Sequence, residues 1–246
     1  MDIKIPYTPR KHQAFLHNKI SKHRWSVLVC HRRFGKTVCM INHLIRSALL
    51  SKNKNPRYAY ISPTFKQSKS IAWDYMKQFT AKIPYTKFNE TELRVDLPNG
   101  SRITLLGSEN SDGLRGIYLD GCVIDEYANV NDKLFPEIIR PALSDRKGYC
   151  VFIGTPQGMN NNFYELYQHA QGAEDWFNYK AKASETKIVD NEELVKAKEV
   201  MGEKKYLQEF ECDWIANIEG SIYNDTLVKM EDQKQLTRVP YDPSLP

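Results

Sequence analysis

Short apolar runs that alternate with helical patterns constrain the fold of this chain more than any other feature. Five candidate strands occupy residues 26–30, 57–62, 121–125, 149–153 and 177–182. Apolar residues at helical spacing follow the first of these runs, over residues 36–50. Strands that alternate with helices in this way predict an α/β fold with a mostly parallel sheet that helices cover on both faces.

The rest of the chain adds further helices and one hairpin. Helices are expected over residues 10–21, 66–81, 133–143, 163–170, 191–200 and 203–214. Residues 93–97 and 102–106 alternate in hydrophobicity around Asn99-Gly100, which predicts a β-hairpin. We expect three parts: a core of residues 1–185, a small helical lid subdomain of residues 186–238, and a proline-containing linker of residues 239–246.

Composition excludes two classes of protein. No apolar run approaches the roughly 20 residues of a membrane-spanning helix, and the N-terminus lacks the pattern of a secretory signal. The five cysteines form no C-x-x-C pair, so a zinc ribbon or redox motif is not expected and the thiols should be reduced. Cys30, Cys122 and Cys150 lie in apolar runs and are expected to pack in the core.

Positive charge is concentrated in the first quarter of the chain. Residues 1–60 contain 13 Lys or Arg and one acidic residue, whereas the net charge of all 246 residues is +5. A basic region of this kind indicates binding of a polyanion such as nucleic acid or nucleotide, and a solvated surface is the alternative.

The segment Cys30-His31-Arg32-Arg33-Phe34-Gly35-Lys36-Thr37 lies between an apolar strand and a helix. Gly35, Lys36 and Thr37 match the end of the phosphate-loop motif G-x-x-x-x-G-K-[ST], but Cys30 replaces its first glycine. Backbone N–H groups at a helix N-terminus face phosphates, and the helix dipole adds positive potential. Lys36 would then contact the β- and γ-phosphates, and Thr37 would offer its hydroxyl to Mg²⁺.

Two further strand ends carry candidate site residues. Asp125 and Glu126 follow the strand at 121–125, where Asp125 can hold Mg²⁺ and Glu126 can orient the attacking water. Gly154 and Thr155 follow the strand at 149–153, where they can sense the γ-phosphate. Taken separately, the first pair can be an acidic helix cap and the second a simple turn. Together with the phosphate loop, the three motifs predict an NTPase with an additional central strand and a catalytic glutamate, of the ASCE/RecA-like P-loop class.

These residues resemble the large terminase subunit of tailed bacteriophages, the motor that packages viral DNA. The segment CHRRFGKT is similar to the family's variant Walker A loop, VIDEYANV to its Walker B motif with the catalytic glutamate, and FIGTPQG to its coupling motif. Residues 111–116 (SDGLRG), 60–64 (YISPT) and 7–13 (YTPRKHQ) resemble further signatures, the last being the adenine-reading segment. The similarity extends over roughly residues 5–220.

The resemblance implies roles for individual residues. Arg10 and Gln13 would contact the adenine, Arg32 or Arg33 the phosphates, and Arg115 would be an arginine finger supplied by a neighbouring subunit. A structural salt bridge is the alternative for Arg115. The ATP-binding set is thus Arg10, Gln13, His31, Arg32, Arg33, Phe34, Gly35, Lys36, Thr37 and Val38.

The resemblance also implies a cellular role in viral genome packaging. ATP and Mg²⁺ are the expected cofactors, and the expected partners are double-stranded DNA, a portal protein, the small terminase subunit and further copies in a ring, in the host cytoplasm with no membrane. The nuclease domain that usually follows in this family is expected to be absent, and with it DNA cleavage. A helicase-like translocase of superfamily 2 and a nucleotide-binding scaffold without activity are the alternatives.

Overall fold

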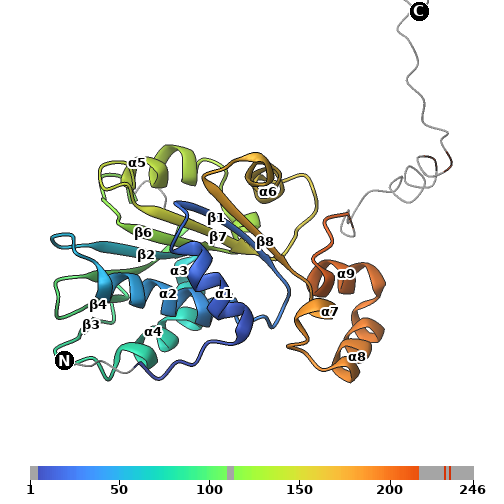
Figure 1. The fold of residues 1–246 in the computed structure, drawn as a ribbon, viewed down its shortest axis with the longest axis horizontal. Helices are drawn as coiled ribbons and strands as arrows, with labels where there is room; N and C mark the ends of the chain where they lie inside the picture. The colour runs from blue at the N-terminus through green and yellow to red at the C-terminus, as the bar shows by residue number, and fades with distance from the viewer. Residues whose placement is uncertain (1–4, 110–113, 216–229, 231–232, 234–246) are drawn as a thin grey trace, which may run out of the picture.

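The computed structural model describes residues 5–109, 114–215, 230 and 233, and is built on one twisted sheet (Figure 1). Its strands are β1 (Trp25–Cys30), β2 (Arg57–Ser62), β3 (Lys87–Asn89), β4 (Arg94–Asp96), β5 (Arg102–Gly107), β6 (Gly121–Asp125), β7 (Tyr149–Gly154) and β8 (Trp176–Ala181). The order across the sheet is β3-β4-β5-β2-β6-β7-β1-β8. All pairings among β5, β2, β6, β7, β1 and β8 are parallel, and β3 and β4 extend one edge in antiparallel fashion.

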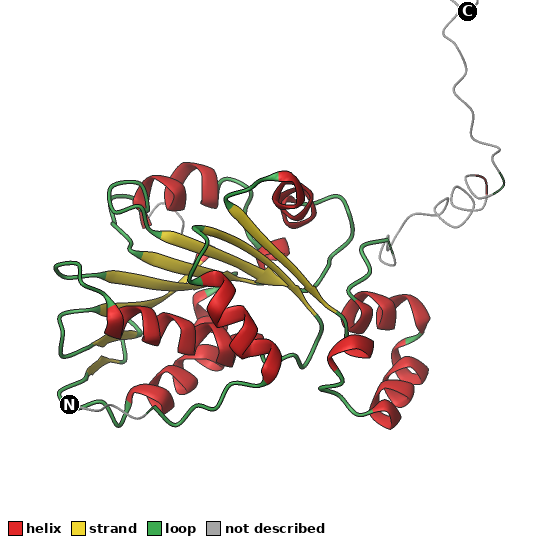
Figure 2. Cartoon of the chain, in the orientation of Figure 1, coloured by secondary structure: helices red, strands yellow, loops and turns green. Residues whose placement is uncertain are grey.

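Helices cover both faces of the sheet, as Figure 2 shows. One face carries α1 (Lys11–Ile20), α2 (Lys36–Leu50), α3 (Phe65–Gln67), the π-helix η1 (Ser68–Ala72) and α4 (Trp73–Thr80). The other carries the 3-10 helix η3 (Tyr127–Asn129), the π-helix η4 (Leu134–Ile139), α5 (Arg140–Ala142) and α6 (Asn162–Gly172). The helices α7 (Ala183–Thr186), α8 (Asn191–Met201) and α9 (Glu203–Glu211) lie together beyond the end of β8.

The alternation of side chains along the strands builds a separate core on each face. Leu28 and Val123 point into the core beneath α2 and α4, whereas Val27 and Cys122 point into the core beneath α5 and α6. A third, small cluster around Ala183, Leu194 and Phe210 holds α7, α8 and α9 together. The α/β fold with a mostly parallel, doubly covered sheet is therefore confirmed, and the division near residue 185 stays a prediction.

Most predicted elements are confirmed, and the exceptions have local causes. The helix expected over residues 66–81 is interrupted by η1, and that over 133–143 consists of η4 and α5, which contain Pro136 and Pro141 and so lack two backbone N–H donors. The helix expected to reach residue 214 ends at Glu211 because Cys212 is left-handed, with φ of 54°. The elements β3, η3 and α7 were not expected from the sequence pattern, and the expected linker lies outside the described residues.

The cysteines and the helix lengths can be compared with the expectations from composition. All five cysteines are buried and free, which confirms core positions for Cys30, Cys122 and Cys150. Within the part of the chain that the structure describes, no helix combines the length and apolar character needed to cross a membrane.

Candidate active site

The three motifs meet because their strands are neighbours. In the sheet, β7 lies between β6 and β1, with Val29 of β1 opposite Gly154 and Asp125 of β6 opposite Ile153. Since all three strands run parallel, the phosphate loop, the Asp125–Glu126 pair and the segment after Gly154 emerge at one edge of the sheet. The carboxyl edge of a parallel sheet is where ligand sites of such folds lie.

The phosphate loop ends in a helix N-terminus that is open to an anion. Arg33 and Gly35 have positive φ angles of 69° and 87°, and Phe34 donates its backbone N–H to the carbonyl of His31 at 3.3 Å. The helix α2 begins directly after Gly35 with no side-chain cap and no acidic residue in its first turn. Its first N–H groups are therefore left for a ligand such as phosphate.

Two loop side chains anchor the loop to the protein. His31 is fully buried, and its ring nitrogens lie 2.6 Å from the carbonyl oxygen of Arg32 and 2.8 Å from the hydroxyl of Thr186. Phe34 is also fully buried and packs edge-on against the rings of His12 and His31. Contacts from these two residues to ATP would therefore come from their backbone atoms.

Lys36 lies between the loop and the two carboxylates. Its ammonium donates to the carbonyls of Cys30 and His31 at 3.0 and 3.2 Å. Burial raises the pKa values of Asp125 and Glu126, and the positive charge of Lys36 opposes this rise. Thr37 and Val38 follow in the first turn of α2, and both are half-buried.

The residues expected to read adenine contact the backbone of the phosphate loop. The Gln13 amide nitrogen donates to the carbonyl of Gly35 at 3.3 Å, and its oxygen accepts the backbone N–H of Arg10 at 2.9 Å. The Arg10 guanidinium approaches the carbonyl of Phe34 at 3.5 Å. A contact of Arg10 or Gln13 with adenine stays a prediction, because both polar ends of the Gln13 amide are already bonded within the protein.

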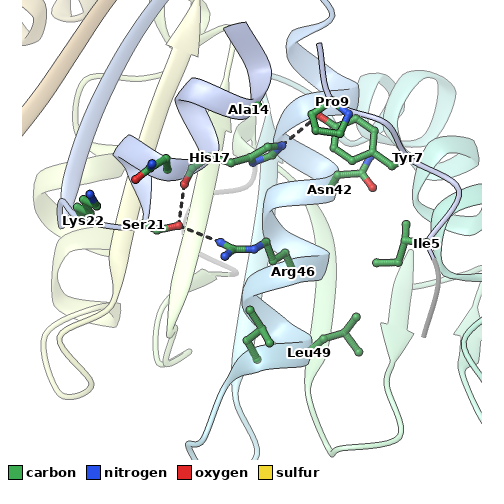
Figure 3. Close-up of a pocket in the computed structure, with 12 residues that line it drawn as sticks. Ile5, Tyr7, Pro9, Ala14, His17, Ser21, Lys22, Asn42, Arg46 and Leu49 are labelled. Carbon is green, nitrogen blue, oxygen red and sulfur yellow. Dashed lines mark hydrogen bonds between the residues drawn. The ribbon is translucent and has the colours of Figure 1, made fainter. Parts of the chain in front are cut away.

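A cavity of about 860 Å³ lies beside this segment but apart from the phosphate loop (Figure 3). Tyr7 and Pro9 form one wall, Ala14 and His17 of α1 another, and α2 lines it beyond the first turn of that helix. None of its lining residues belongs to the segment from His31 to Val38. This cavity is therefore separate from the candidate site.

Tyr60 is a site residue that the sequence analysis missed. It is buried in β2, and its hydroxyl donates to an Asp125 carboxylate oxygen. Burial and the neighbouring Asp125 charge raise the pKa of Tyr60, and the nearby Thr37 side chain opposes this rise, so Tyr60 lies beside both residues expected to hold Mg²⁺. A carboxylate and a hydroxyl beside a phosphate site are the donors that Mg²⁺ prefers, and the residues fit the ion. The sequence signal that could have indicated Tyr60 is a tyrosine inside an apolar strand, because a buried tyrosine hydroxyl needs a hydrogen-bond partner.

Glu126 adopts a backbone conformation that is unusual for its residue type. Its φ and ψ angles of 49° and 45° are left-handed, which costs energy for a non-glycine residue. A side chain on the neighbouring Gly154 would meet Phe163 at 3.2 Å and approach the Glu126 Cα at 3.6 Å. Burial, followed by the charge of Asp125, raises the pKa of Glu126. A half-buried carboxylate with a raised pKa, at a left-handed turn that directly follows its strand, is suited to accept a proton or orient a water.

The arginines differ in their positions. Arg32 and Arg33 are exposed on the loop, and the Arg32 guanidinium lies 3.8 Å from the Glu209 carboxylate of α9. Arg115 precedes β6, is 58% exposed at its side chain, and lies 3.7 Å from Glu137. The ion pair with Glu137 is the salt bridge that was the alternative role for Arg115. Because the Arg115 side chain is exposed, a role as an arginine finger at another subunit stays a prediction. Residues 111–113 of its signature lie outside the described residues.

Two terminase large subunits are similar to this chain in sequence. The large terminase subunit of Thermus phage G20c is 26% identical over 182 residues, which are 66% of this chain and 36% of that protein. That of Thermus virus P23-45 is 40% identical over 60 residues, which are 24% of this chain and 12% of that protein. The chain therefore spans about a third of the G20c protein.

Solved structures are similar in fold. The large terminase ATPase domain of Thermus phage P74-26 superposes with a TM-score of 0.72 at 21% identity and covers 85% of this chain and 95% of that one. The large terminase of another thermophilic bacteriophage, in complex with ADP, superposes with a TM-score of 0.72 at 16% identity. This match covers 83% of this chain and 53% of that one. The sequence model "Terminase large subunit, T4likevirus-type, N-terminal" matches residues 29–230. Because that match covers most of the chain, the protein belongs to this terminase large-subunit family.

Proposed function

We propose that this chain is the ATPase motor part of a terminase large subunit, which couples hydrolysis of ATP to movement of double-stranded DNA into a procapsid. The observation that carries the proposal is the meeting of Lys36 and Thr37 with Asp125 and Glu126 across the β1-β7-β6 edge. The family supports it, as do the complexes of the second thermophilic bacteriophage's large terminase with ADP and with ATP-γ-S.

In the proposed reaction the triphosphate lies on the N-terminus of α2. A water held by Glu126 attacks the γ-phosphorus, the bond from that phosphorus to the β-bridging oxygen breaks, and the water's proton passes to Glu126 or a phosphate oxygen. Lys36 leaves the loop carbonyls and meets the charge that grows on the phosphoryl oxygens. Mg²⁺, held by Thr37 and Asp125, would neutralise phosphate charge when bound.

Arginines would complete this site. Arg32 or Arg33 supplies positive charge from the loop, and Arg115 of a neighbouring copy supplies it from outside. Such a finger increases turnover by about 10³–10⁵ in related phosphoryl-transfer systems. Loss of the γ-phosphate would then shift the segment that begins at Gly154 and Thr155.

The partners of the proposed motor follow from its family and charge. Grip on DNA would be independent of sequence and sensitive to salt, because it acts through phosphates. The portal protein, the small terminase subunit and a ring of copies on the portal, in the host cytoplasm, belong to the same proposal.

Phosphate release in the presence of MgATP, with and without DNA, tests the proposal. We expect turnover that the substitution Glu126→Gln abolishes. Tight nucleotide binding without any hydrolysis, at high protein concentration and with DNA and portal added, would instead favour the scaffold. Strand separation by the purified chain would favour the helicase-like alternative.

A further inference from the structure

The helix α9 contacts the phosphate loop through Glu209. The Glu209 backbone carbonyl accepts the N–H of Arg32 at 2.7 Å, and its carboxylate lies 3.8 Å from the Arg32 guanidinium. Lys205, one turn earlier, holds the same carboxylate at 3.3 Å. The loop that would carry the phosphates is thus attached to a helix about 180 residues further along the chain.

The preceding residue, Gln208, attaches the same helix to the segment after β7. Its side chain is fully buried, and its amide nitrogen donates to the Pro156 carbonyl at 2.6 Å and to the Gln157 side-chain oxygen at 3.2 Å. Its own oxygen accepts from the Lys205 ammonium at 3.0 Å. Both polar atoms of this amide therefore have partners. Two of the partners, Pro156 and Gln157, belong to the predicted coupling segment, residues 152–158.

The coupling segment is held at its far end as well. Asn161, which caps α6, donates to the carbonyls of Gln157 and Gly158 at 3.1 and 2.8 Å. At its near end, Gly154 lies against the backbone of Glu126. Because the segment is held at both ends, a displacement of Pro156 and Gln157 would also displace the backbone of Glu126.

The Arg32 ion pair and the Gln208 hydrogen bonds of α9 differ in strength, while the backbone bond from Arg32 to Glu209 holds α9 to the loop. The Arg32 guanidinium is largely exposed, and an exposed ion pair contributes little, so an ATP phosphate can draw it away from Glu209. Gln208 is buried, and separating it from Pro156 would leave a buried donor and acceptor unpaired. A change at the phosphate loop would then move α9 and the coupling segment together.

We propose that Gln208 is a positioning residue for ATP turnover, which makes the segment after β7 follow α9 when Arg32 changes its partner at the phosphate loop. This inference rests on the proposed ATPase function. Gln208 touches no reacting group and acts through Pro156 and Gln157 on the turn that carries Glu126.

Steady-state kinetics of Gln208→Met test the inference, because methionine has a similar size and loses all three side-chain hydrogen bonds. We expect kcat to fall between about 3-fold and 30-fold while the KM for ATP stays within about twofold. The matched control is Gln168→Met at an exposed glutamine of α6, which should leave both constants unchanged. If Gln208→Met does not fold, Gln208→Glu, which keeps the size and removes the donor, replaces it.

A double-mutant cycle with Arg32→Ala separates positioning from mere support of the fold. If Gln208 acts through the change of partner of the Arg32 guanidinium, its substitution should cost clearly less in the Arg32→Ala background than in the parent. An equal loss in both backgrounds would overturn the inference, and so would a lowered melting temperature with unchanged kcat. A parent chain without hydrolysis would refute the ATPase function itself, whereas hydrolysis that needs Glu126 but not Gln208 refutes this inference alone.

Discussion

Replacing Glu126 by glutamine should change activity and stability in opposite directions. The amide keeps the size of the side chain and its left-handed backbone, but it cannot take a proton from water. General-base catalysis contributes about 10²–10⁴ in rate, so kcat should fall by that factor, which corresponds to about 3–5 kcal/mol of transition-state stabilisation. Nucleotide affinity should remain, since no contact of Lys36 or the loop is lost.

The same substitution should raise the melting temperature. Burial and the charge of Asp125 raise the pKa of Glu126, so the ionised carboxylate opposes folding at neutral pH, and a neutral amide removes this cost. A gain of 1 kcal/mol corresponds to about 2–4 °C for a chain of this size. Because the folded-state pKa lies above the unfolded value, the parent loses stability as pH rises through the folded pKa. The advantage of glutamine should therefore be present at pH 7 and vanish below about pH 4.5, the ordinary value.

Phosphate release, titration with a fluorescent ATP analogue and thermal denaturation at the two pH values measure these effects. Glu199→Gln, at an exposed glutamate of α8, is the control for loss of one negative charge and should change none of them. A kcat within threefold of the parent would remove Glu126 from the reaction. A melting temperature that falls would show that the carboxylate supports the fold, which contradicts the electrostatic reasoning.

Three other substitutions test separate parts of the site. Lys36→Ala should abolish nucleotide binding, and a fluorescent-nucleotide titration that still saturates near the parent affinity would contradict its role. Tyr60→Phe removes a hydrogen bond to the half-buried Asp125 carboxylate, worth about 1.5–3 kcal/mol. It should lower the melting temperature and raise the Mg²⁺ concentration for half-maximal turnover. An unchanged Mg²⁺ dependence would leave Tyr60 a purely structural residue. Arg115→Ala protein should regain hydrolysis when mixed with Glu126→Gln protein, and the absence of rescue would argue against a finger in trans.

The parallel strands and α2 could be predicted closely because their signals are local. The run at 57–62 and that at 121–125 have the predicted bounds, and α2 spans residues 36–50 as expected. Strand and helix periods, a glycine before the helix and carboxylates after a strand all lie within a few residues. The meeting of Lys36 with Asp125 and Glu126 then followed from the general rule on parallel sheets.

Contacts between distant segments could not be predicted in this way. Tyr60 and Asp125 are 65 residues apart, and their hydrogen bond depends on β2 being the neighbour of β6 in the sheet. Gln13 matched an adenine-reading motif, yet its amide bonds the loop, because α1 lies against the N-terminal end of α2. A motif gives the residue type and its approximate place, whereas the packing decides which atoms it meets.

The wrongly predicted end of α9 has the most direct consequence for the site. Had the helix continued to residue 214, the Glu209 carbonyl would accept the N–H of Asp213 in the regular helical pattern. Cys212 instead adopts a left-handed conformation, and the Asp213 N–H turns back to Leu207 at 3.0 Å. This early stop leaves the Glu209 carbonyl free for the N–H of Arg32, so the termination of one surface helix creates the backbone link between that helix and the phosphate loop.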